Sequence, residues 1–183
     1  MFLDPSDFTF VSSLEANWQQ IRDEFEALPH DAFDPWVQQS MHGEGWSTYG
    51  LFVAGNRVER ACRNCPRTAE LVGKIDGVSL AGFSRLAPQS HIRPHEGWAK
   101  SVFRLHLGLV VPPGCRFRVG EEVRSWHEGK CMVFDDTVEH EAWNDSDQFR
   151  SVLLLDFLRP GFTDFTADTV PEDVRRYAEK LIS

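Results

Sequence analysis

Two histidines lie in sequence settings that suit metal binding. His95 stands in Pro94-His95-Glu96-Gly97, and His140 follows the acidic stretch Phe134-Asp135-Asp136. Two distant imidazoles that a fold brings together can hold iron, zinc or copper, and a site with few protein ligands and open positions favours non-haem iron. A single histidine near a strand is more often a partly buried structural residue than a ligand. The hypothesis therefore concerns the pair.

Cationic side chains accompany the two histidines. Arg104 and His106 alternate with apolar residues, which places both on one face of a predicted strand. Arg150 begins an apolar segment further along the chain. Because an arginine makes a two-pronged contact with a carboxylate, these residues predict an anion pocket beside the metal site.

The third ligand of the expected metal site is an open question. Many iron sites use two histidines and one carboxylate, but the position two residues after His95 is Gly97, which has no side chain to offer. Glu96 has the wrong alternation to share the strand face of His95, whereas Asp135 or Asp136 could reach the metal from a turn. We expect a two-histidine site, with completion by one of these acids as the alternative. The simpler interpretation of Asp135 and Asp136 is that they fix the turn through hydrogen bonds to nearby backbone.

The elements that must position these residues are mostly strands. Short apolar segments alternate with turn sequences between positions 78 and 157, a pattern typical of a β-sandwich or barrel. The predicted strands are Val78–Phe83, Val102–Val111, Arg116–Val119, Lys130–Phe134 and Ser151–Phe157.

Helices are expected on either side of this β-core. Apolar residues at helical spacing predict a helix over about 13–28, which a capping box at Ser12-Ser13-Leu14-Glu15 begins and Pro29 ends. Proline in the first turn and a following glycine predict a helix over about 66–72. Thr169 as N-cap predicts a last helix over about 170–182. We expect a single domain over 1–183, with a helical N-terminal part at about 10–75, a β-core at about 76–160 and the C-terminal helix.

The composition limits which binding partners and which cellular compartment we expect. The 183 residues include 28 acidic and 19 basic side chains, a net charge of −9 that disfavours binding to nucleic-acid phosphates. The sequence contains no apolar run near the ~18–20 residues of a membrane span, and its start lacks the features of a signal peptide. We therefore expect a cytoplasmic protein that binds neither nucleic acid nor membrane. Cys62 and Cys65 have C-x-x-C spacing, but without a second pair nearby they are interpreted as ordinary thiols rather than a redox or zinc pair.

Several blocks of sequence between Ser84 and Pro160 carry a family resemblance. They are His91-x-x-Pro94-His95-x-Gly97, Arg104-Leu105-His106-Leu107-Gly108-Leu109, Trp126-x-x-Gly129-Lys130, Phe134-Asp135-Asp136-x-x-x-His140-x-x-Trp143-Asn144 and Arg150. In order and spacing they resemble the aspartyl/asparaginyl β-hydroxylase family of Fe(II)/2-oxoglutarate dioxygenases. The strong resemblance covers a little under half of the chain.

The resemblance implies a mainly β fold, namely a double-stranded β-helix (a cupin-like jelly roll) with flanking N- and C-terminal α-helices. It implies that His95 and His140 bind Fe(II) and that water takes the place of a third protein ligand. The residues that it implies for 2-oxoglutarate are Ser84 and Arg150 at the distal carboxylate, Arg104 and His106 at the metal-chelating end, and Trp46 beside the cosubstrate.

The implied reaction uses O2 to convert 2-oxoglutarate to succinate and CO2 and to hydroxylate an unactivated carbon, the β carbon by expectation, of an amino acid or amino-acid-like small molecule. Peptide-hydroxylating relatives carry an arginine two residues before the position of Arg104, where this chain has Val102. A small molecule is therefore favoured over a peptide. The competing hypotheses are a non-catalytic metal-binding jelly-roll sensor or binding protein and, with less support, a zinc hydrolase.

Overall fold

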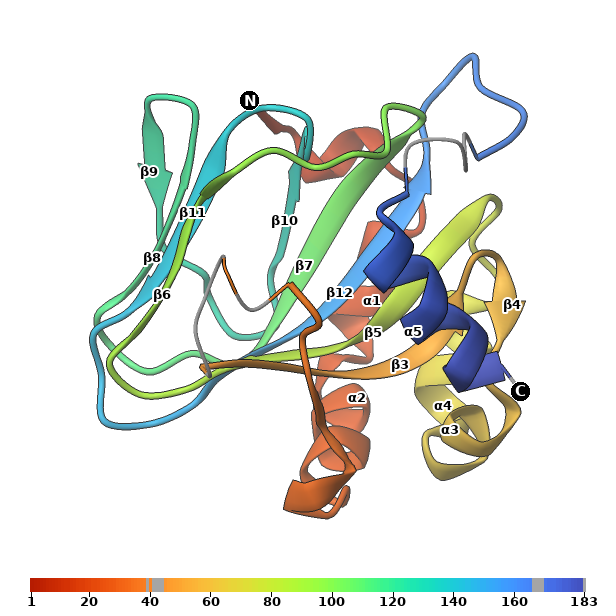
Figure 1. The fold of residues 1–183 in the computed structure, drawn as a ribbon, viewed down its shortest axis with the longest axis horizontal. Coiled ribbons are helices and arrows are strands. Elements are labelled where there is room, and N and C mark those ends of the chain that lie inside the picture. Colours follow the sequence, from red (N-terminus) through yellow and green to blue (C-terminus); the bar gives the residue numbers. More distant parts are fainter. Residues whose placement is uncertain (39, 41–44, 166–169, 183) are drawn as a thin grey trace.

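The computed structural model of the protein describes residues 1–38, 40, 45–165 and 170–182 (Figure 1). Its elements in chain order are β1 (Phe2–Leu3), η1 (Pro5–Asp7), α1 (Val11–Ala16), α2 (Trp18–Glu26), η2 (His30–Ala32), β2 (Asp34–Pro35), β3 (Trp46–Val53), β4 (Asn56–Arg57), α3 (Glu59–Asn64), α4 (Pro66–Val72), β5 (Val78–Leu86), β6 (Ser90–His95), β7 (Val102–Val110), β8 (Cys115–Val119), β9 (Glu122–Arg124), β10 (Cys131–Phe134), β11 (His140–Asn144), β12 (Arg150–Leu158) and α5 (Glu172–Ile182).

The strands of the described residues form two antiparallel sheets. The larger has the order β1-β10-β7-β12-β5-β3-β2, with β4 paired to β3, and the smaller has the order β6-β11-β8-β9. From β5 onward the chain passes repeatedly between the sheets, which face each other in Figure 1. This is a double-stranded β-helix with flanking helices, and it confirms the predicted fold class.

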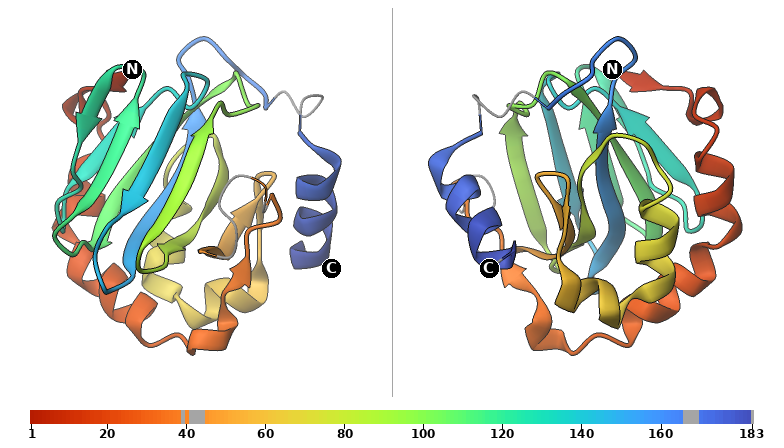
Figure 2. Two further views of the ribbon diagram at one scale, coloured as in Figure 1. Left: turned by 60° about the vertical axis from the view of Figure 1, so that its left-hand side comes forward. Right: turned by 90° about the vertical axis from the view of Figure 1, so that its right-hand side faces the viewer.

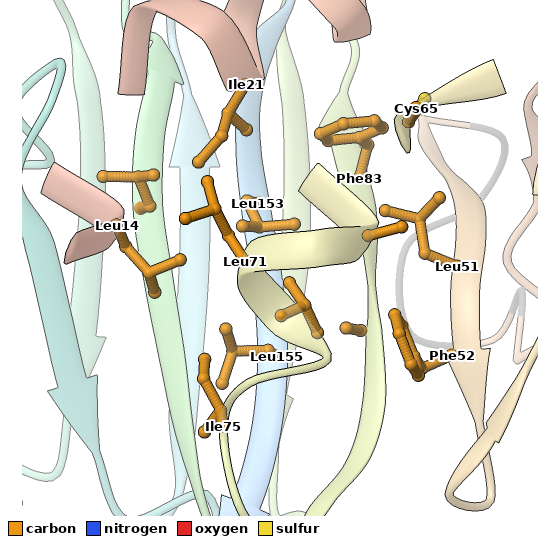
Figure 3. Packing of buried hydrophobic residues seen from close by; sticks show 14 of the residues in the cluster. Leu14, Ile21, Leu51, Phe52, Cys65, Leu71, Ile75, Phe83, Leu153 and Leu155 are labelled. Atoms are coloured by element: carbon orange, nitrogen blue, oxygen red, sulfur yellow. The ribbon is translucent and has the colours of Figure 1, made fainter. Parts of the chain in front are cut away.

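Alternation along the central strands divides the core into two layers. In β12, Leu153 and Leu155 pack against the helices α1 to α4, as Figure 3 shows. Val152 and Leu154 point the other way, into the space between the two sheets. Because successive residues of a strand face opposite sides, one strand stabilises the helical layer and lines the interior of the jelly roll.

The five predicted strands are present as β5, β7, β8, β10 and β12, with shifted ends. The strands β3, β6 and β11 were not predicted. Charged residues and Pro94 interrupt the apolar pattern of β6. Since β3 lies within the region 10–75, the expectation that this region is helical is wrong: it combines helices with strands of the larger sheet.

The predicted helix over 13–28 is two helices, α1 and α2. Asn17 separates them, with φ −111° and ψ 11°. Its amide donates to the Ser13 carbonyl at 2.7 Å, and its side-chain oxygen accepts from Arg67 at 2.8 Å, so it competes with the helical backbone pattern. The capping box is also wrong, because α1 begins after Phe10 and the Ser12 hydroxyl donates to a carbonyl of the preceding turn.

The other helices agree better with expectation. α4 matches the predicted helix over 66–72, and α5 is the predicted last helix, although Thr169 lies outside the described residues. α3 was not predicted. Within the described segments, no helix has both the length and the apolar character needed to cross a membrane.

Two elements share the inner face of the larger sheet. The smaller sheet covers the side near β7 and β10, whereas α5 lies over β3 (Figure 2). The Tyr177 hydroxyl of α5 is 3.3 Å from the Thr48 hydroxyl of β3.

Candidate active site

His95 and His140 lie side by side between the two sheets. They are directly paired across β6 and β11, and their ring centroids are 4.2 Å apart. A β-bulge lets Ile92 and His95, which are three residues apart on β6, both face inward opposite Ala142 and His140. The fold therefore brings together the two predicted metal ligands.

The backbone fixes the orientation of both rings. Nδ1 of His95 donates to the Arg93 carbonyl at 2.7 Å, and Nδ1 of His140 donates to the Val138 carbonyl at 2.8 Å. Because a carbonyl can only accept, Nδ1 carries the proton and each Nε2 keeps a lone pair. Burial lowers the pKa of His95, and burial together with the nearby His95 lowers the pKa of His140 to about 3. Both rings are neutral, as metal binding requires.

The Asp136 carboxylate occupies the place of a side chain at position 97. A Cβ on Gly97 would lie 1.7 Å from Asp136 Oδ2. Asp136 Oδ1 lies 3.3 Å from Nε2 of His140 and 2.7 Å from Nη1 of Arg104. An acid thus stands beside the histidines, although no group of three His, Cys, Asp or Glu side chains in the described part of the chain has the arrangement of a metal site.

Asp135 makes its contacts within the turn and with Arg159. It accepts hydrogen bonds from the Thr137 backbone at 3.0 Å and from the Thr137 hydroxyl at 2.7 Å, and it forms an ion pair with Arg159. The simpler interpretation, in which the acid fixes the turn, is therefore right for Asp135.

Arg104 is held between two buried carboxylates. Its Nε and Nη2 donate to the Asp156 carboxylate at 2.7 and 2.9 Å, and its Nη1 pairs with Asp136. Burial alone would lower the pKa of Arg104, but these two acids raise it above its ordinary value. Sequence reasoning missed Asp156, which lies opposite Arg104 on β12. A single acid within an apolar strand was the signal that could have revealed it.

Arg150 is a buried cation in very different surroundings. It is 1% exposed, and its Nε and Nη1 make no hydrogen bond to any residue that the structure describes. Its guanidinium carbon lies 4.5 Å from the centre of the Trp126 ring. Burial lowers its pKa to about 10, still high enough to keep it charged at neutral pH. Because burying an unpaired charge is costly, Arg150 is suited to receiving an anion.

His106 presents a second unsatisfied donor. Trp126 Nε1 donates to His106 Nδ1 at 3.2 Å, so the neutral ring carries its proton on Nε2. That Nε2 is buried and has no hydrogen-bond partner among the described residues. Burial, followed by the charges of Arg150 and Arg104, lowers the pKa of His106 well below its ordinary value and keeps the ring neutral.

Ser84 and Trp46 complete the cavity. Trp46 Nε1 donates to Ser84 Oγ at 3.0 Å, which orients the hydroxyl and leaves its own proton available. One cavity is lined by both histidines and by all five residues that the family resemblance implies for 2-oxoglutarate: Trp46, Ser84, Arg104, His106 and Arg150. Their individual roles remain predictions.

Fold and site together define a jelly-roll protein whose interior holds a pair of neutral histidines beside a buried cationic pocket. The chain belongs to the aspartyl/asparaginyl β-hydroxylase family, whose model matches residues 15–160. This confirms the family resemblance.

Named relatives match over most of the chain. Human aspartyl/asparaginyl beta-hydroxylase is 36% identical over 170 residues, which cover 88% of this chain and 22% of the relative. The ornithine lipid ester-linked acyl 2-hydroxylase of Rhizobium tropici is 37% identical over 168 residues, covering 86% and 60%. Human aspartate beta-hydroxylase domain-containing protein 2 is 37% identical over 165 residues, covering 82% and 44%. The chain thus spans about a fifth to three-fifths of the length of these relatives.

Similar solved structures include cupin-type proteins. A predicted oxalate decarboxylase from Thermotoga maritima has a TM-score of 0.49 at 13% identity, covering 70% of this chain and 93% of that chain. The cupin domain of a Schizosaccharomyces pombe protein has a TM-score of 0.47 at 8% identity, covering 74% and 72%.

Proposed function

We propose that this protein is an Fe(II)/2-oxoglutarate-dependent dioxygenase that hydroxylates an unactivated carbon, the β carbon by expectation, of an amino acid or amino-acid-like substrate. In the balanced reaction, substrate, O2 and 2-oxoglutarate give hydroxylated substrate, succinate and CO2. Bound iron would supply the oxidising chemistry. Membership in a hydroxylase family supports the reaction class.

The observation that carries this proposal is the unpaired Arg150. Among the residues that the structure describes, two nitrogen atoms of the buried Arg150 and Nε2 of His106 have no hydrogen-bond partner, and these donors line one cavity with the Ser84 hydroxyl. Such a set favours a small anionic ligand. 2-Oxoglutarate is a dicarboxylate of suitable charge. Arg150 and Ser84 would bind its distal carboxylate, and the Nε2 atoms of His95 and His140 would bind Fe(II).

The remaining residues of the site would position and shield the reactants. Arg104 holds the Asp136 carboxylate close to His140, where it contributes negative charge beside the metal position. Phe117 and Phe134 pack against the His140 ring and line the same cavity. Apolar walls of this kind exclude water, which strengthens the contacts between the buried arginine and a carboxylate.

Anaerobic titration tests the proposal. Fe(II) and 2-oxoglutarate together should give the weak visible charge-transfer band of a chelated complex. His95→Ala and His140→Ala should each abolish the band, whereas His127→Ala, at an exposed position, should retain it. Intact protein that binds iron but develops no band would contradict the assignment.

Succinate release separates the enzyme from the metal-binding sensor. A compound that stimulates 2-oxoglutarate turnover and gains one oxygen excludes the sensor. A zinc hydrolase instead predicts oxygen-independent activity with Zn(II). A substrate library read by mass tests all three hypotheses together.

A further inference from the structure

Asp156 is a buried acid that stands outside the cavity of the two histidines. Its side chain is 2% exposed, and it lines a separate cavity together with Ser101 and Val102. Among the described residues, those that line the cavity of the histidines include Arg104 but not Asp156. Any effect of Asp156 on that cavity must therefore pass through a residue that it contacts.

The backbone register places Asp156 opposite Arg104. The two residues pair directly across β12 and β7, so both side chains leave the larger sheet on the same face. Oδ1 of Asp156 accepts from Nε of Arg104 at 2.7 Å, and Oδ2 accepts from Nη2 at 2.9 Å. Because a guanidinium is planar, a two-pronged contact of this kind fixes its plane as well as its position.

This orientation determines where the third nitrogen of Arg104 lies. Nη1 takes no part in the contact with Asp156, and it lies 2.7 Å from Oδ1 of Asp136. The same oxygen of Asp136 is 3.3 Å from Nε2 of His140. Since His140 is neutral, Arg104 is the one cation that pairs with Asp136 in the part of the chain that the structure describes. A chain of contacts thus runs from Asp156 through Arg104 and Asp136 to a predicted metal ligand.

A second arginine–acid pair nearby has a purely structural geometry. Asp135 forms a two-pronged pair with Arg159, and its other hydrogen bonds come from Thr137 in the same turn. Within the described residues, these contacts do not continue to either predicted metal ligand. The pair that contains Arg104 differs from this one because its third nitrogen does continue to them.

We propose that Asp156 is a positioning residue for the candidate metal site: by holding Arg104 in one plane, it keeps the Asp136 carboxylate beside the histidines. The inference rests on the proposed function for the metal position at His95 and His140. If Asp156 only neutralised Arg104, its replacement would change stability but not metal binding. Residues that support metal ligands from outside typically change metal affinity by about 10–100-fold when they are replaced.

Metal affinity tests the proposal without 2-oxoglutarate or O2. Metal-free protein is titrated with Co(II), followed by visible absorption, and with Fe(II) under anaerobic conditions. Asp156→Asn keeps the shape of the side chain but cannot accept from both nitrogens of Arg104, so affinity should fall by about tenfold. Glu24→Gln is the matched control: it alters a partly buried carboxylate that accepts from Thr68 in the helical layer, and affinity should stay unchanged. Unchanged affinity in Asp156→Asn would overturn the proposal.

A double-mutant cycle shows whether Asp156 acts through Asp136. In an Asp136→Asn background Arg104 has no carboxylate to position, so adding Asp156→Asn should have little further effect on metal affinity. A loss of the same size in both backgrounds would indicate a through-space effect of removing one negative charge. That result would overturn the positioning role.

A second variant keeps the proposal testable if circular dichroism shows that Asp156→Asn does not fold. Arg104→Lys keeps the positive charge, but a single ammonium nitrogen cannot reproduce the planar contact with Asp156 and the contact with Asp136 together. Metal affinity should again fall by about tenfold. Wild-type affinity in Arg104→Lys would contradict the proposal.

The outcomes are distinct from those that test the proposed function. Metal affinity that does not depend on Asp156 leaves the dioxygenase proposal standing, because His95 and His140 remain available to hold iron. A missing charge-transfer band in iron-loaded protein contradicts the dioxygenase and leaves the effect of Asp156 on metal affinity unaffected.

Discussion

Two arginines share one cavity but differ in whether nearby carboxylates neutralise their charge. Arg104 is compensated by Asp136 and Asp156, whereas Arg150 rests on the Trp126 ring and has no acidic partner in the described part of the chain. An arginine whose charge is neutralised by carboxylates has a structural role in the site. An uncompensated cation lowers stability, and a binding site is where such a cost is expected.

We predict that Arg150→Met raises the free energy of unfolding of the metal-free protein by about 1–3 kcal/mol, because it removes an unpaired buried charge. Arg104→Met should lower it by about 3–5 kcal/mol, because it leaves two carboxylates buried without a cation. Urea denaturation measures both changes, with the half-exposed Arg116→Met as the control. Equal destabilisation by the two buried substitutions would contradict this account of Arg150.

The identities of the site residues were more predictable than their contacts. His95 and His140 were singled out by their sequence settings and by the family resemblance, and Arg150 by its place at the start of an apolar segment. The contact between Asp136 and the empty side-chain position of Gly97 depends on how a turn folds against a distant strand. Alternation and spacing carry no information about such a contact.

At the scale of elements, strands with an apolar face toward the helices were predictable, whereas β3, β6 and β11 were not. β7 and β12 carry apolar residues on the face toward the helices, so their pattern is strong. β6 and β11 replace apolar residues with His95 and His140, and β3 contains Gly50, which disfavours a strand. The residues that give these strands a function weaken the signal that would identify them.

Helix α5 depends on few buried side chains, so its docking should be sensitive to Val174. Val174 is 5% exposed, and Val174→Ala should destabilise the docked helix by about 1–2 kcal/mol. Hydrogen exchange over 172–182 should then accelerate about tenfold, with little change in β7 and β12. Glu179→Ala, at an exposed position of the same helix, is the control. Uniform acceleration throughout the molecule would indicate instead that α5 opens only with global unfolding.

The net charge of the whole molecule and the charge of its interior cavity have opposite character. The net charge is −9, yet the cavity between the sheets contains two arginines and three histidines. Because the histidines are buried beside cations, the folded state keeps them neutral. The arrangement that prepares the interior for a metal and an anion therefore links the stability of the whole fold to pH.

We predict that the metal-free protein loses stability as the pH falls below about 6.5, the ordinary histidine value. Burial, with the charges of Arg150 and Arg104, lowers the pKa of His106 well below that value, and burial with His95 lowers the pKa of His140 to about 3. Between pH 6.5 and these lowered pKa values, the unfolded chain binds protons that the folded chain does not, so the free energy of unfolding decreases on acidification. Each histidine contributes up to about 1.4 kcal/mol per pH unit.

Urea denaturation between about pH 7 and pH 4 should show a slope that His106→Asn reduces by about one proton, with the exposed His127→Asn as control. If His106→Asn left the slope unchanged, His106 would not be a neutral buried donor, and the anion pocket would lose one of its supports.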